Sequence, residues 1–180
     1  AIELKPSSAA AYANLGNLYR EARHNRERAE DFYRQAIELA PDDAEPRNGL
    51  GLITLDRGQL PEAERWIRQS LEREPASPIY LNNLGDTLRM RGHPEEAEKL
   101  LRRAIELDPT YTSPFGNLGI IQAERKQFAD AERTFRELLT RSQDNARLPA
   151  LVNLAYVCGE QGKIEEAERL LRQALELAPD

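Results

Sequence analysis

Asn83-Leu84-Gly85 returns along the chain as Asn117-Leu118-Gly119, 34 residues later. The same three positions read Asn14-Leu15-Gly16 and Asn153-Leu154-Ala155 elsewhere. Two further series follow the same period, one of alanine (Ala29, Ala63, Ala97, Ala131 and Ala167) and one of proline (Pro41, Pro75 and Pro109, with Pro179 about two periods later). Self-similarity at a fixed period of about 20–50 residues is typical of repeat proteins. The sequence therefore predicts an array of similar units instead of one or two globular domains.

These positions resemble the tetratricopeptide repeat, a helix–turn–helix unit of about 34 residues with Leu-Gly in its first helix, Ala in its second and Pro at its end. The resemblance covers the whole chain and implies an all-α fold, a right-handed superhelical α-solenoid of antiparallel helix pairs. It implies one solenoid over residues 1–180, with repeats at 9–43, 44–77, 78–111, 112–145 and 146–180. Residues 1–8 match the end of a preceding repeat, so we expect a piece of a longer array.

Each repeat should contain a first helix (helix A) and a second helix (helix B). We expect the A helices at 9–22, 44–57, 78–91, 112–125 and 146–160, and the B helices at 27–40, 61–73, 95–107, 129–141 and 164–177. Gly58, Gly92 and Gly162 follow A helices, where a residue with positive φ commonly ends a helix. Lys126 takes that place in the fourth repeat, which predicts a strained or differently shaped turn.

Small residues on the A helices are expected to let each helix pack closely on its own helix B, against the alanine series. These residues are Gly16, Gly51, Gly85, Gly119 and Ala155. Larger side chains should fill the seam, namely Leu15, Leu50, Leu84, Leu118 and Leu154 from the A helices and Tyr33, Ile67, Leu101, Phe135 and Leu171 from the B helices. Every B helix also carries Glu followed four residues later by Arg. Such pairs contribute only ~0.2–0.5 kcal/mol each, so they predict a solvated, charged face.

The composition excludes several classes of protein. Charged residues make up 31% of the chain and the net charge is −6, which argues against a nucleic-acid binder because such proteins need a basic patch. The single cysteine, Cys158, excludes a disulfide framework and a thiolate-rich metal site. No apolar run approaches the ~20 residues that span a bilayer. We expect a cytoplasmic protein with no catalytic residues, no cofactor and no metal.

The resemblance implies a partner-binding groove on the concave face, lined by the A helices. Its residues are expected to be Asn14, Asn17, Arg20, Asn48, Leu52, Ile79, Asn82, Asn83, Asp86, Arg89, Asn117, Ile120, Asn153 and Tyr156. The same projection adds Glu21, Asp56, Met90, Glu124 and Glu160. This mixture of amides, both signs of charge and apolar side chains suits a peptide with apolar anchors.

An asparagine row is the most informative part of this groove. Asn14, Asn83, Asn117 and Asn153 all precede the seam leucine, whereas Gly49 breaks the row in the second repeat. A side-chain amide both donates and accepts hydrogen bonds, so such a row can bind the backbone of an extended peptide. It resembles the asparagine ladder in the helical arm of O-linked N-acetylglucosamine transferase. The alternative is that these asparagines are solvated or support contacts between helices.

The expected function is a protein–protein interaction scaffold that binds a partner peptide or helix in the concave groove. A two-carboxylate clamp, another mode of the family, is disfavoured because none of the residues four before the row is basic: Ala10, Ile79, Ser113 and Pro149. Two alternatives remain open. The chain can be the non-catalytic, substrate-recruiting arm of a larger enzyme such as a glycosyltransferase, or a scaffold that self-associates end to end through uncapped terminal repeats.

Overall fold

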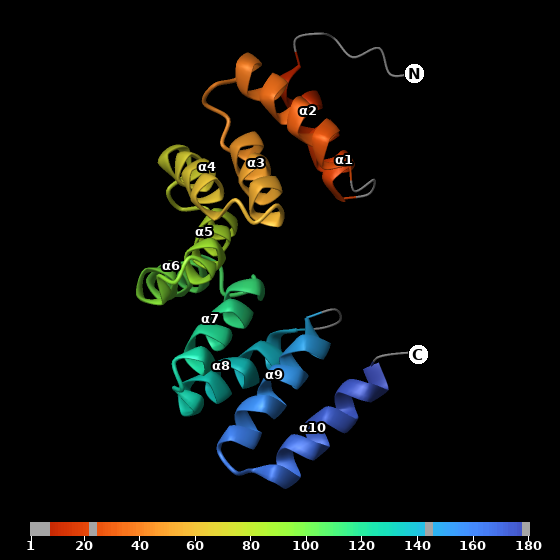
Figure 1. Ribbon diagram of the computed structural model, residues 1–180, viewed down its shortest axis with the longest axis vertical. Helices are drawn as coiled ribbons and strands as arrows, with labels where there is room; N and C mark the ends of the chain where they lie inside the picture. Colours follow the sequence, from red (N-terminus) through yellow and green to blue (C-terminus); the bar gives the residue numbers. More distant parts are fainter. Residues whose placement is uncertain (1–7, 22–24, 143–145, 178–180) are drawn as a thin grey trace. The chain divides into compact units, whose positions relative to one another are not determined.

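The computed structural model describes residues 8–21, 25–142 and 146–177, and over these residues it contains ten helices and no strand (Figure 1). The A helices are α1 (Ala9–Glu21), α3 (Glu45–Asp56), α5 (Pro78–Met90), α7 (Ser113–Glu124) and α9 (Arg147–Glu160). The B helices are α2 (Arg26–Leu39), α4 (Leu60–Arg73), α6 (Pro94–Leu107), α8 (Phe128–Arg141) and α10 (Ile164–Leu177). Every end lies within one residue of the prediction, and the all-α, solenoid class of fold is confirmed.

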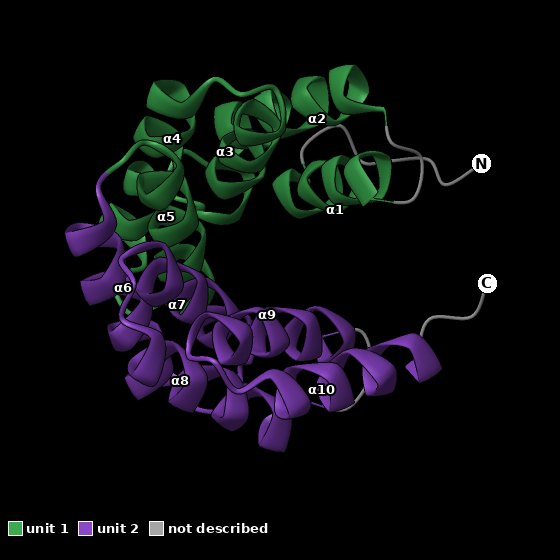
Figure 2. Cartoon of the chain, turned by 60° about the horizontal axis from the view of Figure 1, so that its bottom comes forward, with its two compact units in different colours: residues 1–92 green, residues 93–180 purple. Residues whose placement is uncertain are grey.

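The helices form two compact units, residues 1–92 and 93–180 (Figure 2). In unit 1, α1 packs on α2 and α3, and α3 packs on α2, α4 and α5. In unit 2, α7 packs on α6, α8 and α9, and α9 packs on α8 and α10. The division falls between α5 and α6, so it lies inside the third expected repeat. Apart from Ser8, the expected remnant at residues 1–8 lies outside the described residues.

In the second to fifth repeats, the turn between helices A and B contains a residue in the left-handed backbone conformation. Gly58, Gly92 and Gly162 have φ of 72°, 80° and 76°, as predicted for residues that end an A helix. Lys126 has φ of 58° in the same place. The fourth turn therefore keeps the conformation of the others, and Lys126 carries the strain of a left-handed residue with a side chain.

Replacing Lys126 by glycine is expected to raise the free energy of unfolding by about 1 kcal/mol. The left-handed conformation costs a residue with a Cβ ~1–2 kcal/mol, and the greater freedom of glycine in the unfolded chain offsets part of that gain. Urea denaturation measures the difference. The matched control is Gly92→Ala, which should lose a similar amount because no atom lies within 4 Å of the added Cβ and only the backbone changes. If the Lys126→Gly variant is no more stable than the wild type, the left-handed conformation of Lys126 does not strain the fold.

Gly16, Gly51 and Gly119 each face a large side chain of helix B, and a Cβ on Gly51 would also lie 3.4 Å from the carbonyl oxygen of Ala63, a member of the alanine series. A Cβ on Gly119 would lie 2.5 Å from Cε1 of Phe135, and one on Gly51 would lie 2.5 Å from Cγ1 of Ile67. The absence of a Cβ thus lets a bulky side chain of helix B cross the backbone of helix A. The alanines lie in the core, where the first four of the series are 0% exposed.

Leu171 does not fill a seam, contrary to the sequence expectation. Its counterparts on the other B helices (Tyr33, Ile67, Leu101 and Phe135) are at most 1% exposed, whereas Leu171 is 45% exposed and its neighbour Leu170 is the buried residue. In the first repeat the equivalent residue is Tyr33, and helix α3 of the second repeat covers it, because Tyr33 packs with Leu50 and Ile53. Among the described residues no helix follows α10, so nothing of that kind covers Leu171.

Candidate partner-binding surface

A hollow of about 380 Å³ lies on the A helices of unit 1. It brings together six of the predicted groove residues, namely Asn17, Arg20, Asn48, Leu52, Ile79 and Asn83. Glu21, Gly49, Glu45 and Tyr80 complete its lining, and the last two were missed from the sequence. Glu45 precedes Asn48 by three residues on α3, so helical spacing alone could have placed it on this face. The lining comes from α1, α3 and α5, because stacked repeats place equivalent helices side by side.

A buried tyrosine organises one side of the hollow. Tyr33, on the B helix α2, is 0% exposed, and its hydroxyl donates a hydrogen bond to Oδ1 of Asn17 at 2.6 Å. The amide of Asn17 then donates from Nδ2 to Oε1 of Glu45 at 2.7 Å. Burial raises the pKa of Tyr33, so the hydroxyl stays a donor at physiological pH. Three helices thereby fix the position of one carboxylate.

The same tyrosine gives a physical reason for the break in the asparagine row. A Cβ on Gly49 would lie 2.6 Å from Cε2 of Tyr33, and one on Gly16 would lie 2.5 Å from Cδ1 of the same ring. The ring is therefore enclosed by the backbones of α1 and α3, and an asparagine at position 49 would overlap it. The sequence showed the gap in the row, but its cause is a contact between two repeats.

Asparagines of the second and third repeats bind one another. Asn83 donates from Nδ2 to Oδ1 of Asn48 at 2.9 Å, and Asn82 donates to Oδ1 of Asn83 at 3.4 Å. Asn48 and Asn82 are 7% and 6% exposed, whereas Asn83 is half-buried at the hollow. An amide group has two N–H donors and two acceptor lone pairs, so Asn83 retains capacity for a ligand. Here the row supports the contact between helices and also presents a polar group.

The remaining predicted residues of unit 1 lie outside the lining of this hollow. Asn14 is exposed on α1. Asp86 and Arg89, one turn apart on α5, form an ion pair in which Nη2 and Oδ1 are 3.0 Å apart. Within the hollow, Arg20 forms an ion pair with Glu21.

A smaller hollow of about 160 Å³ lies on unit 2. It brings together Ile120, Glu124, Asn153 and Tyr156 from the predicted residues, with Ala123 and Phe135 completing the lining. Tyr156 is 57% exposed, which is unusual for a large aromatic side chain and leaves it accessible to a partner. Phe135 belongs to the B helix α8 and reaches this surface beside Gly119, as Tyr33 does in unit 1 beside Gly16. Asn117 is half-buried on α7 and does not line this hollow.

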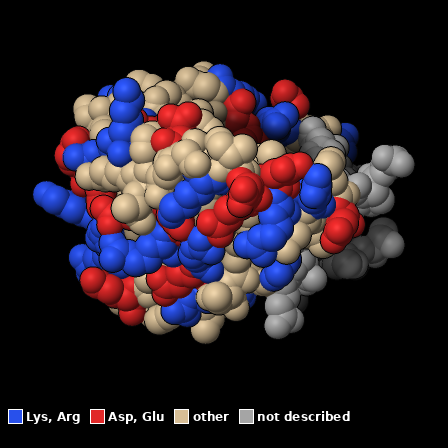
Figure 3. Space-filling model, turned by 90° about the horizontal axis from the view of Figure 1, so that it is seen from below, with Lys and Arg blue, Asp and Glu red and all other residues tan. Residues whose placement is uncertain are grey.

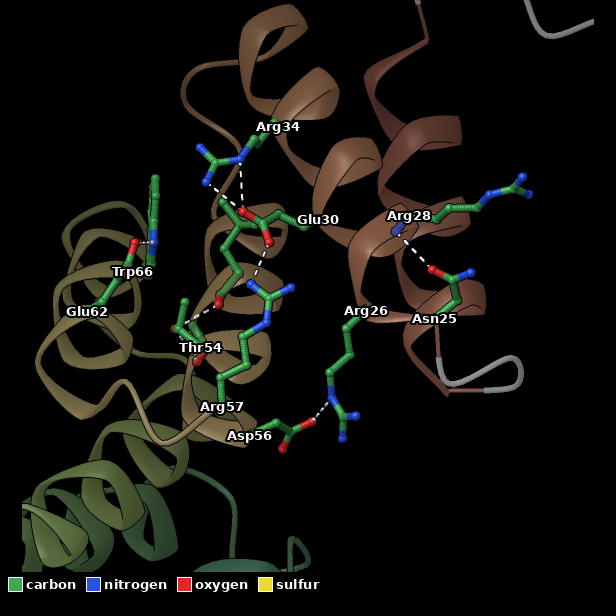
Figure 4. Close-up of polar contacts among 12 residues, drawn as sticks. Asn25, Arg26, Arg28, Glu30, Arg34, Thr54, Asp56, Arg57, Glu62 and Trp66 are labelled. Atoms are coloured by element: carbon green, nitrogen blue, oxygen red, sulfur yellow. Dashed lines mark hydrogen bonds and ion pairs between the residues drawn. The ribbon is translucent and has the colours of Figure 1, made fainter.

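A second set of polar contacts joins successive repeats through the B helices. Glu30 accepts hydrogen bonds from Arg34, one turn later on α2, and from Arg57 at the end of α3, each at 2.7 Å (Figure 4). The pattern recurs as Glu64 with Arg68 and Arg91, Glu98 with Arg102 and Arg125, and Glu132 with Arg136 and Lys163.

These contacts correct the prediction of a merely solvated charged face. The four bridging glutamate side chains are only 13–22% exposed, so each carboxylate lies between two repeats. The second cation comes from the next repeat, which the spacing of four residues within one helix could not show. The side of the molecule drawn in Figure 3 carries positive and negative side chains interspersed.

Cys158 lies beside two carboxylates that are paired with cationic side chains. Its sulfur and a carboxylate oxygen each of Glu132 and Glu166 lie within 4.8 Å of one another. Both carboxylates, however, form ion pairs with Arg136 at 2.8 Å, and Glu132 also binds Lys163. Burial and the two carboxylates raise the pKa of the Cys158 thiol, which keeps it protonated and a poor ligand. Cys158 packs in the core of unit 2.

Stacked helix pairs with a hollowed, partly apolar surface on the A helices define a helical-repeat scaffold for protein interactions. Residues 42–110 and 112–180 match one model of the tetratricopeptide repeat, and residues 11–47 match another. The chain belongs to the tetratricopeptide repeat family. None of the described helices is both long and apolar enough to cross a bilayer.

Solved structures with this fold include PilF, PilW and YrrB. PilF of Pseudomonas aeruginosa has a TM-score of 0.86 at 24% identity, over 96% of this chain and 77% of its own. PilW, a widely conserved type IV pilus biogenesis factor, has a TM-score of 0.82 at 22% identity, over 94% of this chain and 77% of its own. YrrB, described as having an unusual peptide-binding site, has a TM-score of 0.70 at 25% identity, over 99% of this chain and 91% of its own. No curated protein sequence matches this chain significantly.

Proposed function

We propose that this chain binds a segment of a partner protein, as an extended peptide or a short helix, on the surface formed by its A helices. The observation that carries the proposal is the hollow of unit 1, where amides from three successive A helices surround the apolar side chains of Leu52 and Ile79. Ile79 is 52% exposed, and an exposed apolar side chain beside hydrogen-bonding groups is typical of a peptide-binding site. The structural likeness to YrrB, with its peptide-binding site, supports the same function.

Replacing both Asn48 and Asn83, which line this hollow, by alanine is expected to weaken a peptide bound there about tenfold. Each lost hydrogen bond to a ligand contributes ~0.5–1.5 kcal/mol, and two such losses correspond to roughly that factor. The probe is the tightest-binding sequence that the wild-type chain selects from a phage-displayed library of random peptides. Fluorescence anisotropy with the labelled synthetic peptide measures the dissociation constant, and circular dichroism checks that helicity is unchanged.

Gln35→Ala is the matched control, because it removes an exposed amide from the B helix α2. It should leave the dissociation constant unchanged. Failure to select any peptide, or equal affinity of the wild type and the double variant, would overturn the proposed function.

A further inference from the structure

One carboxylate in the hollow of unit 1 is not paired with the arginine that lines the same hollow. Its charged residues are Arg20, Glu21 and Glu45, and Arg20 forms its ion pair with Glu21. Glu45 is bound through Oε1 by the amide of Asn17, which is uncharged. The hollow therefore has a net negative charge, which is located at Glu45.

The surroundings of this hollow add to the negative potential. Tyr80, in its lining, has a raised pKa, because of burial first and then because of Glu74, Glu45 and Asp43. Glu21 and Glu45 act in the same direction on Tyr33, although Arg20 opposes them. An acidic ligand entering here would meet like charges, whereas a basic ligand would meet opposite ones.

Glu45 is held in a fixed position before any ligand arrives. Its carboxylate is linked through Asn17 to the hydroxyl of Tyr33, whose ring is enclosed between Gly16 and Gly49. A positioned group loses less conformational freedom on binding than a mobile surface glutamate. The bond from Asn17 uses one oxygen, so the carboxylate can still accept hydrogen bonds from an ammonium or guanidinium group.

The apolar part of the hollow suits the stem of a long basic side chain. Leu52 and Ile79 come from α3 and α5 and line the same space as Glu45. Lysine and arginine pack their methylene groups along apolar surface while the charged end reaches a polar partner. Charge and apolar contact thus favour the same type of side chain.

We propose that the hollow of unit 1 binds a lysine or arginine side chain of the partner segment, with Glu45 as its counter-charge and Leu52 and Ile79 in contact with its stem and an apolar neighbour. This inference rests on the proposed function, because it names the chemistry of the segment that binds the same surface. It excludes acidic segments as ligands of this hollow.

Selection of peptides from the random library tests the inference by composition. Peptides recovered on the wild-type chain should be enriched in lysine or arginine next to an apolar residue and depleted in aspartate and glutamate. Selection on a Glu45→Gln variant should lose the basic enrichment. Selection on Glu38→Gln, which changes an exposed glutamate of the B helix α2, should keep it.

Affinities then test the pairing of charges directly. For the strongest wild-type peptide, Glu45→Gln should raise the dissociation constant about 5-fold, the upper range for an exposed ion pair, and the difference should shrink at 1 M salt. Replacing the basic residue of the peptide by glutamine should raise the dissociation constant of the wild type by the same factor. It should leave the dissociation constant of the Glu45→Gln variant unchanged. Glu45→Lys should prefer the peptide that carries glutamate there.

The outcomes separate the inference from the function on which it rests. Selected peptides without basic enrichment, or equal affinity of the wild type and Glu45→Gln, would overturn the inference while leaving peptide binding intact. Recovery of no peptide at all would overturn the proposed function and the inference with it.

Discussion

Gly49→Ala is expected to lower the free energy of unfolding by about 2 kcal/mol. The added Cβ would lie 2.6 Å from Cε2 of Tyr33, and the ring cannot move away freely because the backbone of Gly16 encloses its other side. Overpacking of this kind costs ~1–3 kcal/mol and sometimes more, which outweighs the gain of up to ~1 kcal/mol from alanine in a helix. Chemical denaturation followed by circular dichroism measures the loss.

Gly116→Ala is the matched control for this prediction. It also replaces a glycine inside an A helix, α7, but the nearest atom to the added Cβ is Cδ2 of Leu138 at 3.8 Å, an ordinary contact. This variant should be as stable as the wild type or up to ~1 kcal/mol more stable.

A double-mutant cycle identifies the ring as the cause. If Tyr33 limits the space at position 49, then Tyr33→Leu should destabilise the Gly49→Ala variant less than it destabilises the wild type, by at least ~1 kcal/mol. Additive losses would contradict this explanation.

The ion pairs of Glu132 are expected to make the stability of the wild-type protein fall in acid, because they are lost when the carboxylate is protonated. Hydrogen bonds from Lys163 and Arg136 lower the pKa of Glu132 from 4.5 to about 2. A carboxylate with a lowered pKa stabilises the fold fully above its unfolded pKa, and that stabilisation is lost as pH falls towards the folded value. The free energy of unfolding should therefore decrease by about 1–3 kcal/mol on this account between pH 4.5 and about pH 2.

The difference between wild type and Glu132→Gln isolates this contribution from other acidic groups, such as Glu30. The variant should be less stable by about 1–3 kcal/mol at pH 7, and the two stability curves should converge near pH 2, where Glu132 of the wild type is protonated. Glu38→Gln, an exposed substitution, serves as the control and should follow the wild-type curve. A constant difference over the whole pH range would show that the bridge does not act through the charge of Glu132.

The candidate surface was predicted in part. The resemblance to the tetratricopeptide repeat placed Asn17, Arg20 and Leu52 on the face where the hollow of unit 1 lies. It missed the role of Tyr33, since a B-helix residue reaches the A-helix surface only where glycines leave room for its ring. It also could not show that Asn83 binds Asn48, because the distance between side chains of different repeats depends on how the repeats stack.

The sequence by itself determined the repeat period, the helix ends and the class of fold. These properties are local, since caps, breakers and apolar spacing act within one helix pair. The tertiary structure alone decided which groups of different repeats meet: Asn17 with Glu45, Glu30 with Arg57, and the ring of Tyr33 with Gly49. It also decided that Leu171 is exposed while its counterparts are buried. The physical reason is that stacking sets the contacts between repeats, and a period read along one chain does not contain the geometry of that stacking.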